Sequence, residues 1–79
     1  MGKVIAVESG LTGVGVLTIE NRLYLLGHFG VHIFDEPFLV SNSHVVDFGI
    51  NEEGIWSVDA FGELSYFDPS RPKIKGIRV

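Results

Sequence analysis

The side chains of this 79-residue chain that could do chemistry are few, and its three histidines come first among them. His28 and His32 flank the predicted turn 29–30 and could approach each other across it, as two ligands of one metal ion must. No third ligand stands at a spacing that would complete the site, and the chain has no cysteine. The glycine-rich segment 10–15 precedes a strand and lacks the Lys-Ser/Thr pair of a phosphate-binding loop. We therefore expect neither a metal nor another cofactor.

The positions of the aspartates in the sequence favour a role in turns over a role in acid–base catalysis. Asp35 and Asp68 each precede a turn with a proline, where an aspartate accepts hydrogen bonds from the following backbone N–H groups. Asp59 ends a predicted strand and is expected to form a turn. Asp47 interrupts an apolar strand and could face a central channel if that strand is the innermost of its sheet. Since no serine stands in a Gly-x-Ser-x-Gly setting with a histidine at useful spacing, we expect a protein that is not an enzyme.

Aromatic residues are the better candidates for a binding surface. Two Phe-Gly pairs lie in predicted turns, where an exposed ring could meet a ligand. Tyr24 and Trp56 fall within predicted strands instead, where packing between sheets is the expected role. The predicted binding residues are Phe29, Gly30, Phe61, Gly62 and Asp47.

Composition and charge restrict the partners. The formal net charge of -4 disfavours direct binding of nucleic acid. Residues 4–70 hold all ten acidic side chains and a single base, Arg22, whereas four of the six bases lie in 71–78. This acidic body could meet a basic partner, or it could serve only solubility. The apolar runs are far shorter than the ~18–20 residues that span a membrane, so we expect a cytoplasmic protein without a membrane segment.

Short apolar runs bounded by turn residues predict an all-β protein with a single domain, residues 1–79. Helical periodicity is nearly absent, and ten glycines interrupt every window. Several runs, such as 23–26, are apolar on both faces, which predicts sheets that are covered on both sides. The predicted strands are Val4–Glu8, Val14–Glu20, Leu23–Gly27, Val31–Phe34, Phe38–Ser41, Val45–Ile50, Ile55–Asp59, Leu64–Phe67 and Ile74–Val79.

An internal repeat is predicted from the similarity of segments 14–35 and 45–68. The identities are Ile19/Ile50, Glu20/Glu52, Phe29/Phe61, Gly30/Gly62, Phe34/Phe67 and Asp35/Asp68. The offset grows from 31 to 33 residues along the match, which requires two single-residue insertions in turns. The predicted units are residues 4–37 and 38–79, each a three-strand meander with an outer strand.

The second unit carries the motifs of a known repeat. It has an acidic-glycine turn at 51–54, a strand that opens with Ile55-Trp56, and a strand that closes with 67–69, Phe-Asp-Pro. In these features it resembles a β-propeller blade, and it is most similar to the repeat of the two-component-regulator propeller type. The first unit departs from the pattern, with Arg22 in place of the turn glycine and Tyr24 in place of the tryptophan. The resemblance implies a propeller fold and brings no enzymatic motif.

Two blades cannot close a propeller, since four or more are needed. The resemblance therefore implies a homo-oligomer, a trimer with six blades or a tetramer with eight. The alternative architecture is a monomer or dimer in which the two meanders pack as a small β-sandwich. We expect a non-enzymatic binding module whose ligand is a protein, a small molecule or a glycan. The alternative function is a small acidic inhibitor, of the mobile-element or phage type, that blocks a host enzyme or nucleic-acid-binding complex.

Overall fold

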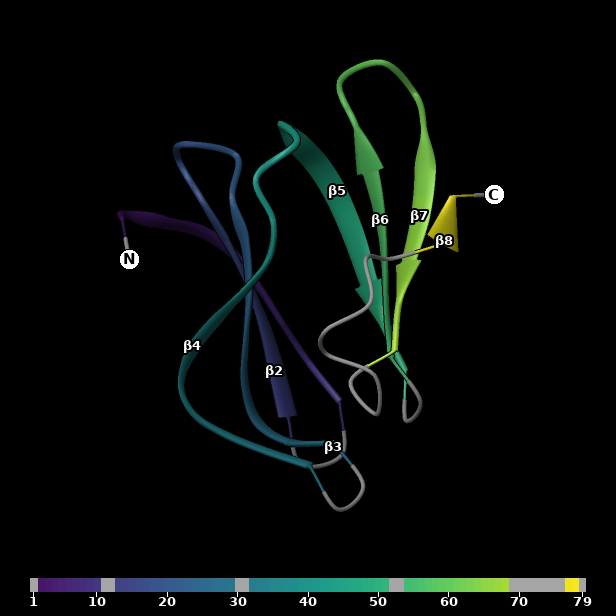
Figure 1. Cartoon of the computed structure of the whole chain (residues 1–79). Coiled ribbons are helices and arrows are strands. Elements are labelled where there is room, and N and C mark those ends of the chain that lie inside the picture. The colour runs from purple at the N-terminus through teal and green to yellow at the C-terminus, as the bar shows by residue number, and fades with distance from the viewer. Residues whose placement is uncertain (1, 11–12, 30–31, 52–53, 69–76, 79) are drawn as a thin grey trace.

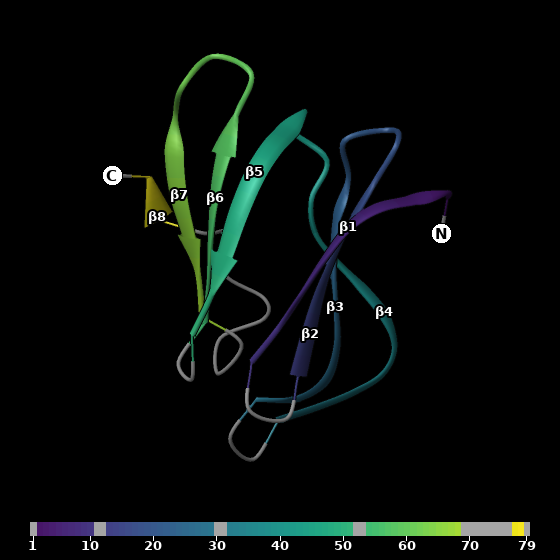
Figure 2. The same cartoon turned by 180° about the vertical axis from the view of Figure 1, so that it is seen from behind.

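The computed structural model describes residues 2–10, 13–29, 32–51, 54–68 and 77–78, and these residues form strands and turns without a helix. The all-β prediction is therefore confirmed. Sheet 1 has the order β1-β2-β3-β4 and sheet 2 the order β5-β6-β7-β8, with every neighbouring pair antiparallel (Figures 1 and 2). The strands are β1 (Val4–Ser9), β2 (Gly13–Thr18), β3 (Leu23–Phe29), β4 (His32–Ser41), β5 (Val45–Ile50), β6 (Ile55–Asp59), β7 (Leu64–Phe67) and β8 (Ile77–Arg78).

β4 is one continuous strand where the sequence predicts two strands on either side of Pro37. The register of β3 against β4 shifts between Leu25, which pairs with Phe38, and Gly27, which pairs with Phe34. The shift leaves extra residues on β4, and Pro37 is one of them. A proline is tolerated there because β4 is the edge of the sheet and a bulged residue needs no N–H partner.

The two sheets divide the chain at residues 42–44, which connect β4 to β5. The predicted boundary between residues 37 and 38 falls inside β4 instead. β5, β6 and β7 have the bounds that the sequence predicts. Of the last predicted strand, Ile74–Val79, only 77–78 lie within the described residues, and they pair with β7.

One hydrophobic core lies between the two sheets. The face of each sheet that looks toward this core is called its inner face, and the opposite face its outer face. The rings of Phe38 in sheet 1 and Phe67 in sheet 2 meet across the core, with centroids 5.6 Å apart. The buried core residues are Leu17, Leu23, Leu25, Val45, Phe48, Ile55 and Phe67.

The sheets approach each other closely at Gly15 in the middle of β2. A Cβ atom at this position would lie 2.7 Å from Cε2 of Phe48 and 3.0 Å from Cδ1 of Ile55. Both distances are shorter than ordinary van der Waals contact. Gly15 therefore allows two side chains of sheet 2 to pack directly on the backbone of sheet 1.

The backbone pairing of the first three strands recurs 41 residues later. The pair Val4↔Thr18 corresponds to Val45↔Asp59, and the register shift that follows Val4 recurs after Val45. Every pair between β5 and β6, and every pair between β6 and β7, is a pair of the first sheet displaced by 41 positions. The two sheets are thus equivalent strand by strand over β1–β3 and β5–β7.

Four pairs of backbone hydrogen bonds outside the strands follow the same displacement. Their donors in the first sheet are the backbone N–H groups of Gly10, Thr18, Ile19 and Asn21, and those in the second sheet are Asn51, Asp59, Ala60 and Gly62. Each acceptor is displaced by 41 positions as well. Asn21 and Gly62 also share a left-handed backbone, with φ of 62° and 83°. The turn geometry is therefore equivalent although the residue types differ.

This equivalence corrects the predicted alignment. The offset of 31 to 33 residues equates the segment of β2 with that of β5, but β2 is the second strand of its sheet and β5 the first. The structure equates β1 with β5, β2 with β6 and β3 with β7, without any insertion. The predicted alignment is displaced by one strand of the meander.

Candidate functional site

Three connections lie together at one end of the molecule, the upper end in Figure 1. They are the β2–β3 turn (18–23), the connection between the sheets (42–44) and the β6–β7 turn (59–63), and together they are called the turn end. The N–H of Val45 donates to the carbonyl of Asn21, and the Asn21 side-chain amide donates to the carbonyl of Val45, each at 2.9 Å. The N–H of Ala60 donates to the carbonyl of His44 at 3.0 Å. These bonds fix the three connections to one another.

The β6–β7 turn displays an aromatic ring on a braced backbone. Oδ1 of Asp59 accepts hydrogen bonds from the N–H groups of Phe61 and Glu63, both at 2.9 Å. The N–H of Gly62 donates to the Asp59 carbonyl at 3.0 Å. Asp59 therefore forms the turn, as its position at the end of a strand predicts. The Phe61 side chain is 89% exposed on this turn.

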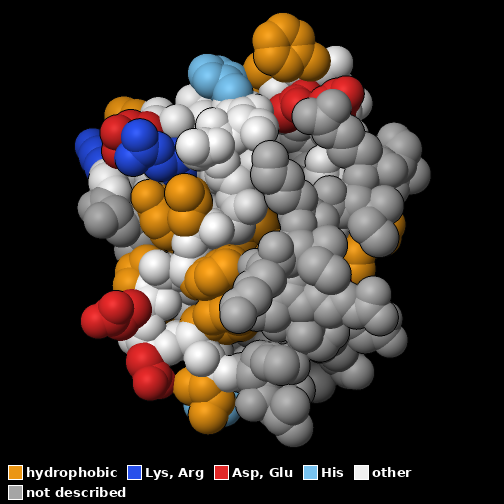
Figure 3. Space-filling view, viewed as in Figure 1, with side chains coloured by type: hydrophobic (Ala, Val, Ile, Leu, Met, Phe, Trp, Pro, Cys, Tyr) orange, Lys and Arg blue, Asp and Glu red, His pale blue; other side chains and the backbone are white. Residues whose placement is uncertain are grey.

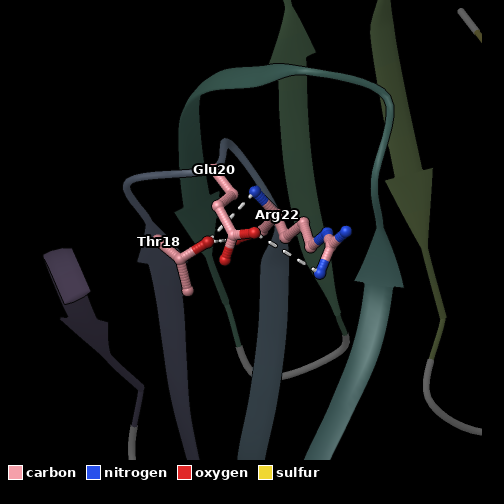
Figure 4. A network of polar contacts seen from close by, with 3 residues as sticks. All are labelled: Thr18, Glu20 and Arg22. Carbon is pink, nitrogen blue, oxygen red and sulfur yellow. Dashed lines mark hydrogen bonds and ion pairs between the residues drawn. The ribbon is translucent and has the colours of Figure 1, made fainter. Parts of the chain in front are cut away.

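The β2–β3 turn is braced by Thr18, which is fully buried. The N–H of Thr18 donates to the Arg22 carbonyl at 3.0 Å, and the Thr18 hydroxyl accepts from the Arg22 N–H at 3.4 Å (Figure 4). Glu20 and Arg22 form an exposed ion pair at 3.8 Å, which contributes little to stability. The turn displays Ile19, whose side chain is 58% exposed.

The predicted binding residues do not form one surface. Phe61 and Gly62 lie at the turn end. Phe29 is the last residue of β3, and the ends of β3 and β4 that flank Gly30 lie at the opposite end of the molecule (Figure 1). Gly30 itself is outside the described residues. The end of β3 at Phe29 and the turn that carries Phe61 therefore lie at opposite ends of the molecule. The predicted alignment equates them because it is displaced by one strand.

Asp47 lies on β5, the edge strand of sheet 2, and its side chain is exposed. Oδ1 of Asp47 accepts a hydrogen bond from the N–H of Phe48 at 2.9 Å, next to the register shift of β5. The carboxylate thus has a local structural role at the bulge. Its β-ladder partner is Val58, which pairs in turn with Leu64 on the outer face of sheet 2.

Sequence reasoning misses three residues of the turn end. Ile19 is predicted as a strand residue but is an exposed turn residue that corresponds to Ala60. Asn21 joins the sheets, and His44 has a left-handed backbone with φ of 59°. An asparagine in a short turn is a sequence signal for this backbone, whereas contacts between sheets leave no local signal.

The chemistry of the turn end is that of an apolar tip among carboxylates. In Figure 3 the hydrophobic atoms at the top stand beside red acidic side chains and a pale blue histidine. Glu20 and Glu63 are exposed on the two equivalent turns. Such a tip fits an apolar pocket with a basic rim. No group of three or more His, Asp or Glu side chains that could hold a metal is found in the part of the chain that the structure describes.

Comparisons with known proteins gave no match: no family model, no curated protein and no solved structure is similar to this chain. Over the described ranges, no helix is long and apolar enough to cross a membrane.

Proposed function

We propose that the protein is a non-enzymatic binding module that works as an assembly of several copies, with the turn end as its ligand-binding surface. The observation that carries the binding role is Phe61, a large apolar side chain that is 89% exposed on a braced turn. A ring so exposed contributes little to folding, because the hydrophobic effect stabilises only apolar surface that is removed from water. The ring is available for a partner instead.

The hydrogen bonds of the β6–β7 turn support this role because they lower the conformational entropy that the turn loses on binding. A loop that must become ordered on binding loses affinity, whereas a pre-organised loop does not. The Asp59 carboxylate already holds the N–H groups on both sides of the tip. An aromatic residue at the centre of an interface is also a common hot spot. The turn therefore favours recognition of a protein with an apolar pocket.

Phe61→Ala is expected to weaken binding at least about thirtyfold without lowering the free energy of unfolding, because truncation of a hot-spot aromatic costs about 2 kcal/mol or more. The measurement uses the immobilised protein as bait in a lysate of the source cells, with captured proteins quantified by mass spectrometry. Ile33→Ala is the matched control, since Ile33 is an exposed apolar residue on β4 outside the turn end.

Two results would contradict the proposed binding surface. Capture of the same partner by Phe61→Ala and wild-type protein in equal amounts would show that the ring is not involved. Capture that survives Phe61→Ala but is lost at high salt would favour the acidic inhibitor, since exposed charge pairs are screened by salt.

A further inference from the structure

The outer face of sheet 1 is apolar along a row that crosses all four strands. The row joins Val7, Val16, Tyr24 and Leu39, which pair successively across the ladders. The residues on the two edge strands, Val7 and Leu39, are 61% and 44% exposed, whereas Val16 between them is buried and Tyr24 is half-buried. Its inner face is already packed on sheet 2, so sheet 1 is apolar on both faces. This is the pattern of a sheet that is covered on both sides.

The outer face of sheet 2 is also apolar, apart from Asp47 on the edge strand β5. One row joins Gly49, Trp56 and Tyr66, and the next joins Asp47 to Val58 and Leu64 (the latter two half-buried). The rings of Trp56 and Tyr66 are in contact, with centroids 4.6 Å apart. Each chain thus carries one apolar outer face at either side of its two-sheet body.

The displacement by 41 positions exchanges the inner and outer faces. Val7, on the outer face of sheet 1, corresponds to Phe48, which is buried on the inner face of sheet 2. Gly15, on the inner face of sheet 1, corresponds to Trp56 on the outer face of sheet 2. In a two-fold arrangement, the inner face of one sheet would be equivalent to the inner face of the other. Here the inner face of one sheet is equivalent to the outer face of the other, so the sheets are packed head-to-tail. A head-to-tail contact leaves one unused copy of each of its two surfaces.

We propose that the outer face of sheet 2 in one copy packs on the outer face of sheet 1 in a second copy, and so repeats the contact that joins the two sheets within the chain. This proposal rests on the assembly in the proposed function and names the surfaces that form it. The second copy is the expected occupant because the outer face of its sheet 1 is equivalent, position by position, to the inner face of sheet 2. That inner face already packs on sheet 1 within the chain.

Large and small side chains alternate between the two surfaces of this contact. Within the chain, the small Gly15 receives the large ring of Phe48. The equivalent positions in the contact between copies are Trp56 and Val7, so the large residue and the small one change sides. Valine and tryptophan together are larger than glycine and phenylalanine, so the two surfaces are expected to lie further apart at Trp56 than the two sheets do at Gly15. This exchange favours a contact between the outer face of sheet 2 and the outer face of sheet 1 over a contact between two copies of the same outer face.

The contact has a consequence for the turn ends. The β2–β3 and β6–β7 turns are equivalent and lie at the same end of the chain (Figure 1). The same displacement between copies therefore places every Phe61 on one face of the assembly. A repeated contact of this kind closes into a ring when the rotation allows it, and several tips on one face bind with higher avidity than one.

Two variants test the head-to-tail contact. Val7→Glu places a charge on the outer face of sheet 1, and Leu64→Glu places one on the outer face of sheet 2. Each variant alone is expected to have the mass of one 8.7 kDa chain in native mass spectrometry. An equimolar mixture is expected to form a 1:1 heterodimer, because each variant keeps the surface that the other has lost. Ile19→Glu, an exposed change at the turn end, is the control and leaves the wild-type assembly intact.

Each outcome decides the proposal. An assembly that survives Val7→Glu or Leu64→Glu, or a mixture that forms no heterodimer, overturns the head-to-tail contact while the proposed function stands. A wild-type mass of one chain at every concentration overturns the contact and the assembly, and leaves the Phe61 surface to its own test. If circular dichroism shows that a variant does not fold, Leu39→Glu replaces Val7→Glu, and Val58→Glu replaces Leu64→Glu.

Discussion

Gly15→Val lowers the free energy of unfolding by about 3 kcal/mol, at the upper end of the usual cost of overpacking a core. The cause is the close approach of the sheets, since the added Cβ alone would lie 2.7 Å from a ring carbon of Phe48. The remaining methyl groups of valine would press further into sheet 2. Relief requires the two sheets to separate, and separation exposes the core that joins them. Urea unfolding followed by the fluorescence of the single tryptophan measures the change.

Gly49→Val is the matched control for Gly15→Val. Gly49 also lies in the middle of a strand, but a Cβ atom there would meet nothing within 4 Å. Valine has a higher strand propensity than glycine, so the change is expected to leave stability within about 0.5 kcal/mol or to raise it. Equal losses at the two positions would contradict the close packing of the sheets at Gly15. Gly49 lies on the outer face of sheet 2, so both variants are compared in the Val7→Glu background, in which no assembly is expected to add to apparent stability.

Asn21→Ala is expected to lower the free energy of unfolding by about 2–5 kcal/mol. The variant loses the hydrogen bond that the side-chain amide donates to the Val45 carbonyl, and an unsatisfied buried acceptor costs about 1–3 kcal/mol. Alanine must also adopt the φ of 62°, which costs about 1–2 kcal/mol for a residue with a Cβ atom. Val45 is buried in the core at the start of β5, so the bond fixes the position of sheet 2.

Asn21→Gly separates the two causes. Glycine loses the same amide but adopts a positive φ without strain, as Gly62 does at the equivalent position. This variant is expected to lose about 1–2 kcal/mol less than Asn21→Ala in the same urea titration. If Asn21→Ala and Asn21→Gly are equally stable, the left-handed backbone is not a source of strain.

The fold class could be predicted because strands leave local signals. β5, β6 and β7 have their predicted bounds, since short apolar runs stand there between Asn, Gly and Asp residues. The continuous strand β4 could not be predicted, because Pro37 is a local signal for a break. Whether a proline ends a strand or lies in an edge bulge depends on the partner strand, and the sequence of β4 alone does not contain that information.

The repeat illustrates a different limit. Neighbouring hairpins of a meander resemble one another in composition, so matching residue types can align one strand with the next. The structural equivalence pairs residues as different as Gly15 and Trp56, which a search for identities passes over. Because neighbouring strands of a meander are antiparallel, an alignment that is displaced by one strand also matches strands that run in opposite directions. The predicted alignment therefore equates Phe29 with Phe61, although the end of β3 and the β6–β7 turn lie at opposite ends of the molecule (Figure 1).

The exposure of Phe61 and the role of Asp59 follow from local sequence, since a strand that ends in aspartate before Phe-Gly predicts a tight turn. The other turn of the site depends on long-range contacts. Asn21 bonds to a residue 24 positions away, across the two sheets. Such a contact becomes visible only when both sheets are placed.

The mass of the wild-type protein in solution tests the central claim, that copies of this chain assemble through their outer faces. Size-exclusion chromatography with light scattering over a wide range of concentration measures it directly. The expected result is a uniform species of three or four 8.7 kDa chains, which places six or eight sheets in one ring. A mass of one chain throughout the range would contradict the claim.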